Sequence, residues 1–100
     1  MIIPKKVKVG RTNYQIHKVT KMNKVGAMGE IDYDTKEITI ASRSSRNSHR
    51  KFSKKEISDT FWHEITHAIL KDMNSKLHVN ESFVTKFANR LTTVISTAKF

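Results

Sequence analysis

The 100-residue sequence contains no cysteine, which excludes disulfide bonds and thiolate metal ligands. It has no apolar stretch of the roughly 20 residues that a membrane-spanning helix needs. Its first residues, 1–6, include no apolar run of signal-peptide length. The length favours a single domain, and a hydrophobic share of 37% is sufficient for one core. We therefore expect one cytoplasmic domain that does not enter a membrane.

Acidic residues are also scarce. There are 9 Asp and Glu against 19 Lys and Arg, so the net charge is +10. This excess favours an acidic partner, such as nucleic acid, a protein bound to nucleic acid, or an acidic substrate. The basic residues are spread along the chain without interleaved aromatic residues, and no nucleic-acid-binding motif is present. The expected contact with nucleic acid is therefore nonspecific and made through the basic surface.

The first 41 residues are expected to be rich in β-structure. Short runs with β-like patterning predict four strands, at residues 6–9, 14–20, 26–33 and 37–41. The last two runs flank Asp34-Thr35-Lys36, which is typical of a hairpin turn that begins with aspartate.

Two helices are predicted after a basic segment. Residues 42–53 are rich in serine and arginine without an apolar pattern, so we expect a mobile loop there. Ser53 and Glu56 form the S-x-x-E pattern of a capping box, which predicts a helix over residues 54–73. Asn80 is a candidate N-cap for a second helix over residues 80–98. One arc of the second helix is apolar and is expected to pack on the first: Phe83, Val84, Phe87, Ala88, Leu91, Val94, Ile95 and Ala98.

The first of these helices carries His63-Glu64-Ile65-Thr66-His67, an H-E-x-x-H motif. Helix positions i and i+4 lie one above the other, so His63 and His67 are placed to ligate one metal ion. Glu64 lies about 60–100° around the helix from each histidine, where it can reach a water bound to that ion. These roles are those of a zinc peptidase, in which zinc activates a water and the glutamate is the general base.

A catalytic zinc site needs about three protein ligands. Leu70 and Met73 occupy the positions at which a metzincin has glycine and histidine, which excludes that class. Two candidates remain, Glu81 and His78. Glu81 is favoured because it lies at the start of the second helix, beside its apolar arc, whereas His78 lies in the connecting loop. Two imidazoles and a carboxylate favour Zn²⁺ as the ion.

With these motifs in place, the chain resembles the small phage- and prophage-encoded zinc metallopeptidases related to ImmA/IrrE. The resemblance covers about residues 26–97 and is carried by residues 29–33, 38–40, 61–70, 80–84 and 87–89. It implies an α+β fold of the minimal zincin type, with a small, mostly antiparallel sheet of three or four strands packed on the H-E-x-x-H helix and a C-terminal helix. It also implies a glutamate as third ligand, and cleavage of an intracellular protein, typically a DNA-bound regulator.

Two alternatives stay open. Proteases of the SprT type use a third histidine, so a ligating His78 would favour them. A different class is a basic, phage-encoded binding or inhibitor protein that acts on a host protein or nucleic acid and has a non-catalytic metal site. The two remaining histidines, His17 in a predicted strand and His49 in the basic loop, are not expected to bind the metal.

Overall fold

The computed structural model describes residues 2–46 and 49–100, while Met1, Asn47 and Ser48 lie outside the described residues. The fold is α+β, as expected, with one four-stranded sheet, two α-helices and a short 3₁₀ helix. In chain order the elements are β1 (Lys6–Val9), β2 (Thr12–Val19), β3 (Gly29–Asp32), β4 (Glu37–Ala41), α1 (Lys54–Asp72), η1 (Lys76–Val79) and α2 (Glu81–Thr97). Within the described ranges no helix has the length and apolar character needed to cross a membrane.

The sheet has the strand order β1-β2-β4-β3 and is mixed. The β1–β2 and β3–β4 pairs are antiparallel, but β2 and β4 run parallel, with Ile16 opposite Ile38. Two of the three pairings are thus antiparallel, as expected, and the parallel β2–β4 pair makes the sheet mixed. After β2 the chain first builds the outer strand β3 and then returns, so β4 fills the place between β2 and β3. This order leaves β1 and β3 as the two edges.

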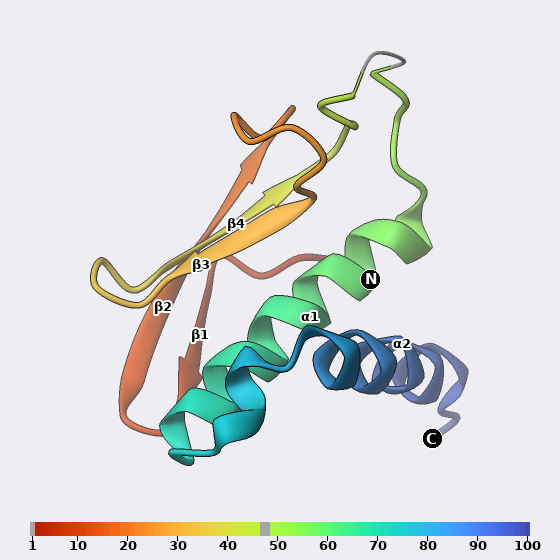
Figure 1. Ribbon diagram of the computed structural model, residues 1–100. Coiled ribbons are helices and arrows are strands. Elements are labelled where there is room, and N and C mark those ends of the chain that lie inside the picture. The colour runs from red at the N-terminus through yellow and green to blue at the C-terminus, as the bar shows by residue number, and fades with distance from the viewer. Residues whose placement is uncertain (1, 47–48) are drawn as a thin grey trace.

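Helix α1 forms the central layer of the molecule, with the sheet on one side and α2 on the other (Figure 1). The sheet turns alternate apolar residues toward α1, as the period of two along a strand requires. Ile38 and Phe61, at the centre of this interface, are almost completely buried. The buried core between the layers consists of Ile3, Val9, Tyr14, Ile16, Ile38, Ile40, Phe61, Ile65 and Ala68.

The start of α1 is fixed by the predicted capping box. Ser53 Oγ accepts a hydrogen bond from the Glu56 backbone N–H at 3.1 Å, and Glu56 Oε1 accepts one from the Ser53 N–H at 3.0 Å. The Arg50 guanidinium adds two hydrogen bonds to the same carboxylate, both 2.8 Å long. These bonds lower the pKa of Glu56 to about 2, because they stabilise the charged form.

The basic segment before α1, apart from Asn47 and Ser48, which lie outside the described residues, contacts the end of the sheet at several points. Phe52 is buried in a small second core with Met22 and Ala41. The backbone N–H of Arg43 donates to the Thr20 carbonyl at 2.8 Å, and Arg43 also forms a β-bridge with Lys51. These contacts could not be predicted from the sequence, because a single buried phenylalanine, Phe52, produces no hydrophobic periodicity.

The β3–β4 turn is organised by Asp32 rather than by Asp34. One carboxylate oxygen of Asp32 accepts hydrogen bonds from the backbone N–H groups of Asp34 and Thr35, at 2.9 and 3.1 Å. Lys36 completes the turn with a positive φ of 60°. The turn begins earlier than the sequence suggested because β3 ends at Asp32.

The apolar arc of α2 is covered only in part. Val84 and Ala88 are buried against α1, together with Thr92, whose hydroxyl donates to the Ala88 carbonyl. Phe87 and Val94 are 47% and 63% exposed, so the expectation that the whole arc packs on the first helix is wrong. The reason is that α2 packs only on α1 and η1 within the described chain, which covers one narrow line of its surface.

Gly29 allows β3 to approach α1 closely. A Cβ atom at this position would lie 2.7 Å from Thr60 Cγ2, 2.9 Å from the Thr39 carbonyl oxygen and 3.5 Å from Glu64 Oε2. The first two separations are shorter than van der Waals contact, so a side chain would force the strand away from the helix.

We therefore expect Gly29→Ala to lower the free energy of unfolding by about 1–3 kcal/mol, because the added methyl overpacks the β3–α1 interface. Chemical denaturation measures this change. The double variant Gly29→Ala/Thr60→Ser, which removes the closest contacting methyl, should recover part of the loss. Equal stability of Gly29→Ala and the wild-type chain would contradict this description of the interface.

Candidate metal centre

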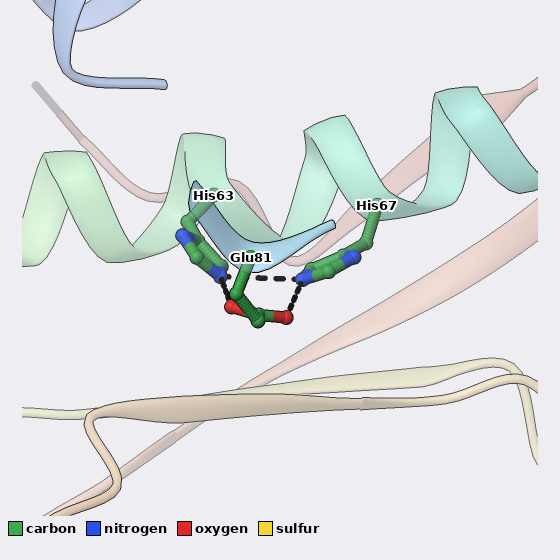
Figure 2. Close-up of side chains that lie close together, drawn as sticks. All are labelled: His63, His67 and Glu81. Carbon is green, nitrogen blue, oxygen red and sulfur yellow. Dashed lines mark hydrogen bonds and ion pairs between the residues drawn. The ribbon is translucent and has the colours of Figure 1, made fainter. Parts of the chain in front are cut away.

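Three side chains that could bind a metal ion converge between α1 and the start of α2 (Figure 2). His63 and His67 project from successive turns of α1, and their Nε2 atoms lie 3.2 Å apart. The Glu81 carboxylate lies against both, with Oε2 at 3.0 Å from His63 Nε2 and Oε1 at 2.8 Å from His67 Nε2. Within the described residues no further histidine or carboxylate joins this group.

Glu81 is positioned by the capped start of α2. Asn80 is the N-cap of α2, as predicted, and its Oδ1 accepts a hydrogen bond from the Phe83 N–H at 3.0 Å. The two helices are joined through η1 rather than through a plain loop, and Ser75 caps η1 by accepting from the Leu77 N–H. Thr85 and Asn89 then lie beside the first half of α1, so α2 runs antiparallel to α1. The backbone at the start of α2 therefore places Glu81 opposite the two histidines.

The orientation of His67 is fixed by the backbone of His78. The Nδ1 of His67 lies 2.6 Å from the His78 carbonyl oxygen, which only accepts, so the ring donates its Nδ1–H. In the neutral imidazole the Nε2 then carries a lone pair, and this atom points at Glu81 and His63. This arrangement of a donating ring nitrogen behind a ligating one is usual for metal-binding histidines.

The His78 side chain does not join the convergent group. Residue His78 lines a neighbouring cavity with Tyr33, Val79 and Glu81. The sequence alternative with His78 as third ligand therefore has less geometric support than Glu81, although the His78 carbonyl does orient His67.

The three side chains lie close enough together to share one metal ion. Zinc bond lengths of about 2.0–2.2 Å place neighbouring ligand atoms roughly 3.3 Å apart. The two histidine Nε2 atoms are 3.2 Å apart, and one ligand atom from each of the three residues lies within 4.8 Å of the other two. Burial lowers the pKa of His63 below its ordinary value, despite the opposing effect of Glu81. A low pKa favours the neutral form, which is the form that binds a metal.

Glu64 lies beside this group, lining cavities with His63, His67 and Glu81. Its side chain is buried, with only 6% exposure, and lies next to Gly29 of β3. Burial raises the pKa of Glu64 to about 8, with smaller contributions from Glu81 and Glu30. A cation held by His63 and His67 would oppose this shift, because it favours the carboxylate form.

Two cavities meet at Glu64. One, of about 440 Å³, is lined by β3, α1 and α2 residues that include Gly29, His63 and Asn89. The other, of about 390 Å³, is lined by Ile31, Tyr33, His67 and Glu81, besides η1 residues. The centre is therefore accessible from both sides along β3. A larger apolar cavity of about 570 Å³ lies on another side of α1, against β1, and contains neither histidine.

Ile31 and Tyr33 belong to the segment 29–33 that carries the family resemblance, but neither side chain is predicted from the sequence to belong to the metal site. Together with Gly29 they occupy alternate positions along β3 and just after it, and they line the cavities beside Glu64. The period of two along the strand is the sequence signal for this shared face. Burial, with Tyr14, Glu64 and Glu81 nearby, raises the pKa of Tyr33 to about 12, so its hydroxyl stays protonated.

The other two histidines lie elsewhere. His17 Nε2 lies 3.1 Å from a Glu37 carboxylate oxygen on the sheet, and His49 Nδ1 lies 3.3 Å from Lys21 Nζ in the basic segment. Neither belongs to the convergent group.

Comparisons with known proteins give no match: no family model fits the chain, and no curated protein or solved structure is significantly similar. The resemblance to the ImmA/IrrE-related peptidases therefore stays a prediction, and the site has to be argued from its own geometry.

We expect about one zinc per chain in the purified wild-type protein and in His78→Ala, and loss of zinc in Glu81→Ala. His78→Ala keeps the backbone carbonyl that orients His67, whereas Glu81→Ala removes a ligand. Elemental mass spectrometry measures all three. Zinc retained in Glu81→Ala but lost in His78→Ala would assign the third ligand to His78, and no zinc in any variant after zinc is supplied would make the motif incidental.

The metal-free protein should lose stability as pH rises through the titration of Glu64. Its folded pKa of about 8 exceeds the ordinary 4.5, so the folded chain keeps a proton that the unfolded chain has released between these values. Glu64→Gln removes this titration. The measured quantity is the free energy of unfolding of Glu64→Gln minus that of wild type. We expect this difference to increase by on the order of 3 kcal/mol between pH 5 and pH 8.5, because wild type loses stability over this range and the variant does not.

Urea denaturation in the presence of a chelator measures this difference at both pH values. Asp34→Asn, at an exposed carboxylate of the β3–β4 turn, is the control and should show no such change. An offset between Glu64→Gln and wild type that is the same at both pH values would show that Glu64 is not protonated in the folded chain.

Proposed function

We propose that the protein is a zinc-dependent peptidase. The observation that supports this most directly is the convergence of His63, His67 and Glu81 beside a buried glutamate, Glu64, at the meeting point of two cavities. A purely structural zinc site is usually closed by four protein ligands, often cysteines. Among the described residues three such side chains converge, and the chain has no cysteine, so an ion held by them would keep one coordination position for a reacting molecule.

His63, His67 and Glu81 would hold the ion, and Zn²⁺ would supply Lewis acidity toward a scissile carbonyl and an attacking water. Glu64 acts as general base, taking one proton from the water as the oxygen–carbon bond forms. It then gives this proton to the leaving nitrogen as the carbon–nitrogen bond breaks. Burial raises the pKa of Glu64 and a bound cation would lower it again, and a base whose pKa lies near neutrality can both accept and return a proton.

The substrate we propose is an extended segment of an intracellular protein or a peptide. β3 is an edge strand, so its outer backbone groups are available to pair with an added strand. Both cavities lie along β3, one beside Gly29 and the other beside Ile31 and Tyr33. A peptide paired with β3 would therefore pass Glu64 and the metal centre.

The decisive variant is Glu64→Gln. It keeps the size of the side chain and all three metal-binding residues but removes the base, so peptide cleavage should fall by about 100-fold or more while zinc content stays at the wild-type level. Cleavage of a peptide library by the zinc-loaded protein, read by mass spectrometry, measures the first quantity. Wild-type peptide cleavage by the Glu64→Gln protein would contradict this mechanism.

The alternative of a basic binding or inhibitor protein makes the opposite prediction for the same variant. Its effect on a host protein or nucleic acid would persist in Glu64→Gln, because that function needs no general base. A zinc-loaded wild-type protein that cleaves no peptide in the library would favour this alternative.

A further inference from the structure

Basic residues occur along the whole chain, but no acidic residue lies in residues 18–28 or 42–55, so the excess positive charge is concentrated in these two segments. Together they contain nine basic and no acidic residues, whereas the rest of the chain has ten basic and nine acidic residues. Almost the whole net charge of +10 therefore comes from these two segments. All nine basic side chains are exposed: Lys18, Lys21, Lys24, Arg43, Arg46, Arg50, Lys51, Lys54 and Lys55.

The fold brings the two segments together at one end of the molecule, which we name the basic end (Figure 1). The Gly26 N–H donates to Ser45 Oγ at 2.9 Å, and this hydroxyl donates to the Lys24 carbonyl at 3.2 Å. Backbone bonds from Ser42 to Val19 and from Arg43 to Thr20 add to the contact. Hydrogen bonds between neutral groups thus hold two positively charged segments together, although their charges repel each other.

Few of these charges are neutralised within the protein. In the part of the chain that the structure describes, ion pairs engage Arg50, with Glu56, and Lys55, with Asp59, and none of the other seven. Lys54 and Lys55 also lie in the first turn of α1, where the helix dipole disfavours positive charge. Binding of an external anion would reduce the repulsion among these unpaired positive charges.

We propose that the basic end binds the phosphate backbone of double-stranded nucleic acid. Exposed lysine and arginine side chains on two adjacent segments are suited to the regularly spaced phosphates of a duplex. The sole aromatic residue of the two segments, Phe52, is buried, so the surface offers no ring on which unpaired bases could stack. Binding is therefore electrostatic and independent of base sequence.

The basic end also adjoins the candidate metal centre. Gly26 and Glu56, the partner of Arg50, line the same cavity as His63 and Glu64. A protein substrate bound to the same duplex would thus lie near the cavity entrance. The nucleic-acid proposal itself does not depend on hydrolysis, and Glu64→Gln should bind a duplex as the wild-type chain does.

The test compares two variants with the same change in net charge. Lys24→Gln/Arg46→Gln/Lys51→Gln removes three charges from the basic end, and Lys6→Gln/Lys86→Gln/Lys99→Gln removes three exposed charges elsewhere. Fluorescence anisotropy with a labelled 20-base-pair duplex, over a series of salt concentrations, gives the affinity and its salt dependence for each protein. Circular dichroism checks that both variants are folded.

We expect the basic-end variant to bind about tenfold or more weakly in low salt and its salt slope to fall by about 2–3, since each lost phosphate contact removes about 0.9 from the slope. The control variant should stay close to wild type in both quantities. Equal losses in the two variants would overturn the proposal in favour of net charge alone. Absence of duplex binding by the wild-type chain, or equal binding of poly-glutamate, would also overturn it.

Discussion

The contact between β3 and α1 at Gly29 determines the geometry of the candidate site. Because no side chain separates the strand from the helix there, Thr60 and Glu64 lie directly under the sheet edge. This approach buries Glu64 and produces the high pKa of its carboxyl group. It also places an edge strand beside the candidate metal centre, so one glycine affects the exposure of the site, the electrostatics of Glu64 and the packing of the core.

The three side chains of the candidate metal centre are positioned mainly by main-chain features. Successive turns of α1 set the spacing of His63 and His67, and a carbonyl of η1 fixes the ring of His67. The Asn80 cap sets where α2 begins, and Glu81 is its first residue. Such backbone constraints need no long-range recognition, which explains how a chain of 100 residues can assemble a site of this kind.

Much of this arrangement could be predicted from local sequence patterns. The capping box at Ser53, the spacing of the two histidines and the N-cap at Asn80 are properties of neighbouring residues, and each appears in the structure as predicted. The parallel pairing of β2 with β4 could not be predicted from local patterns, because strand order depends on contacts between segments that are distant in the sequence. Likewise, periodicity showed that α2 is amphipathic, but the exposure of Phe87 depends on how much of α2 has a neighbour to cover it.

The division of the site between two helices has a thermodynamic consequence. α2 is held against α1 by a narrow line of small buried residues and by the cluster at Glu81. An ion bound there would act as a crosslink between α1 and α2, so its binding energy would also contribute to the docking of α2. The stability of the C-terminal helix would then vary with the concentration of free zinc, and the chain would be most completely folded when it is competent to react.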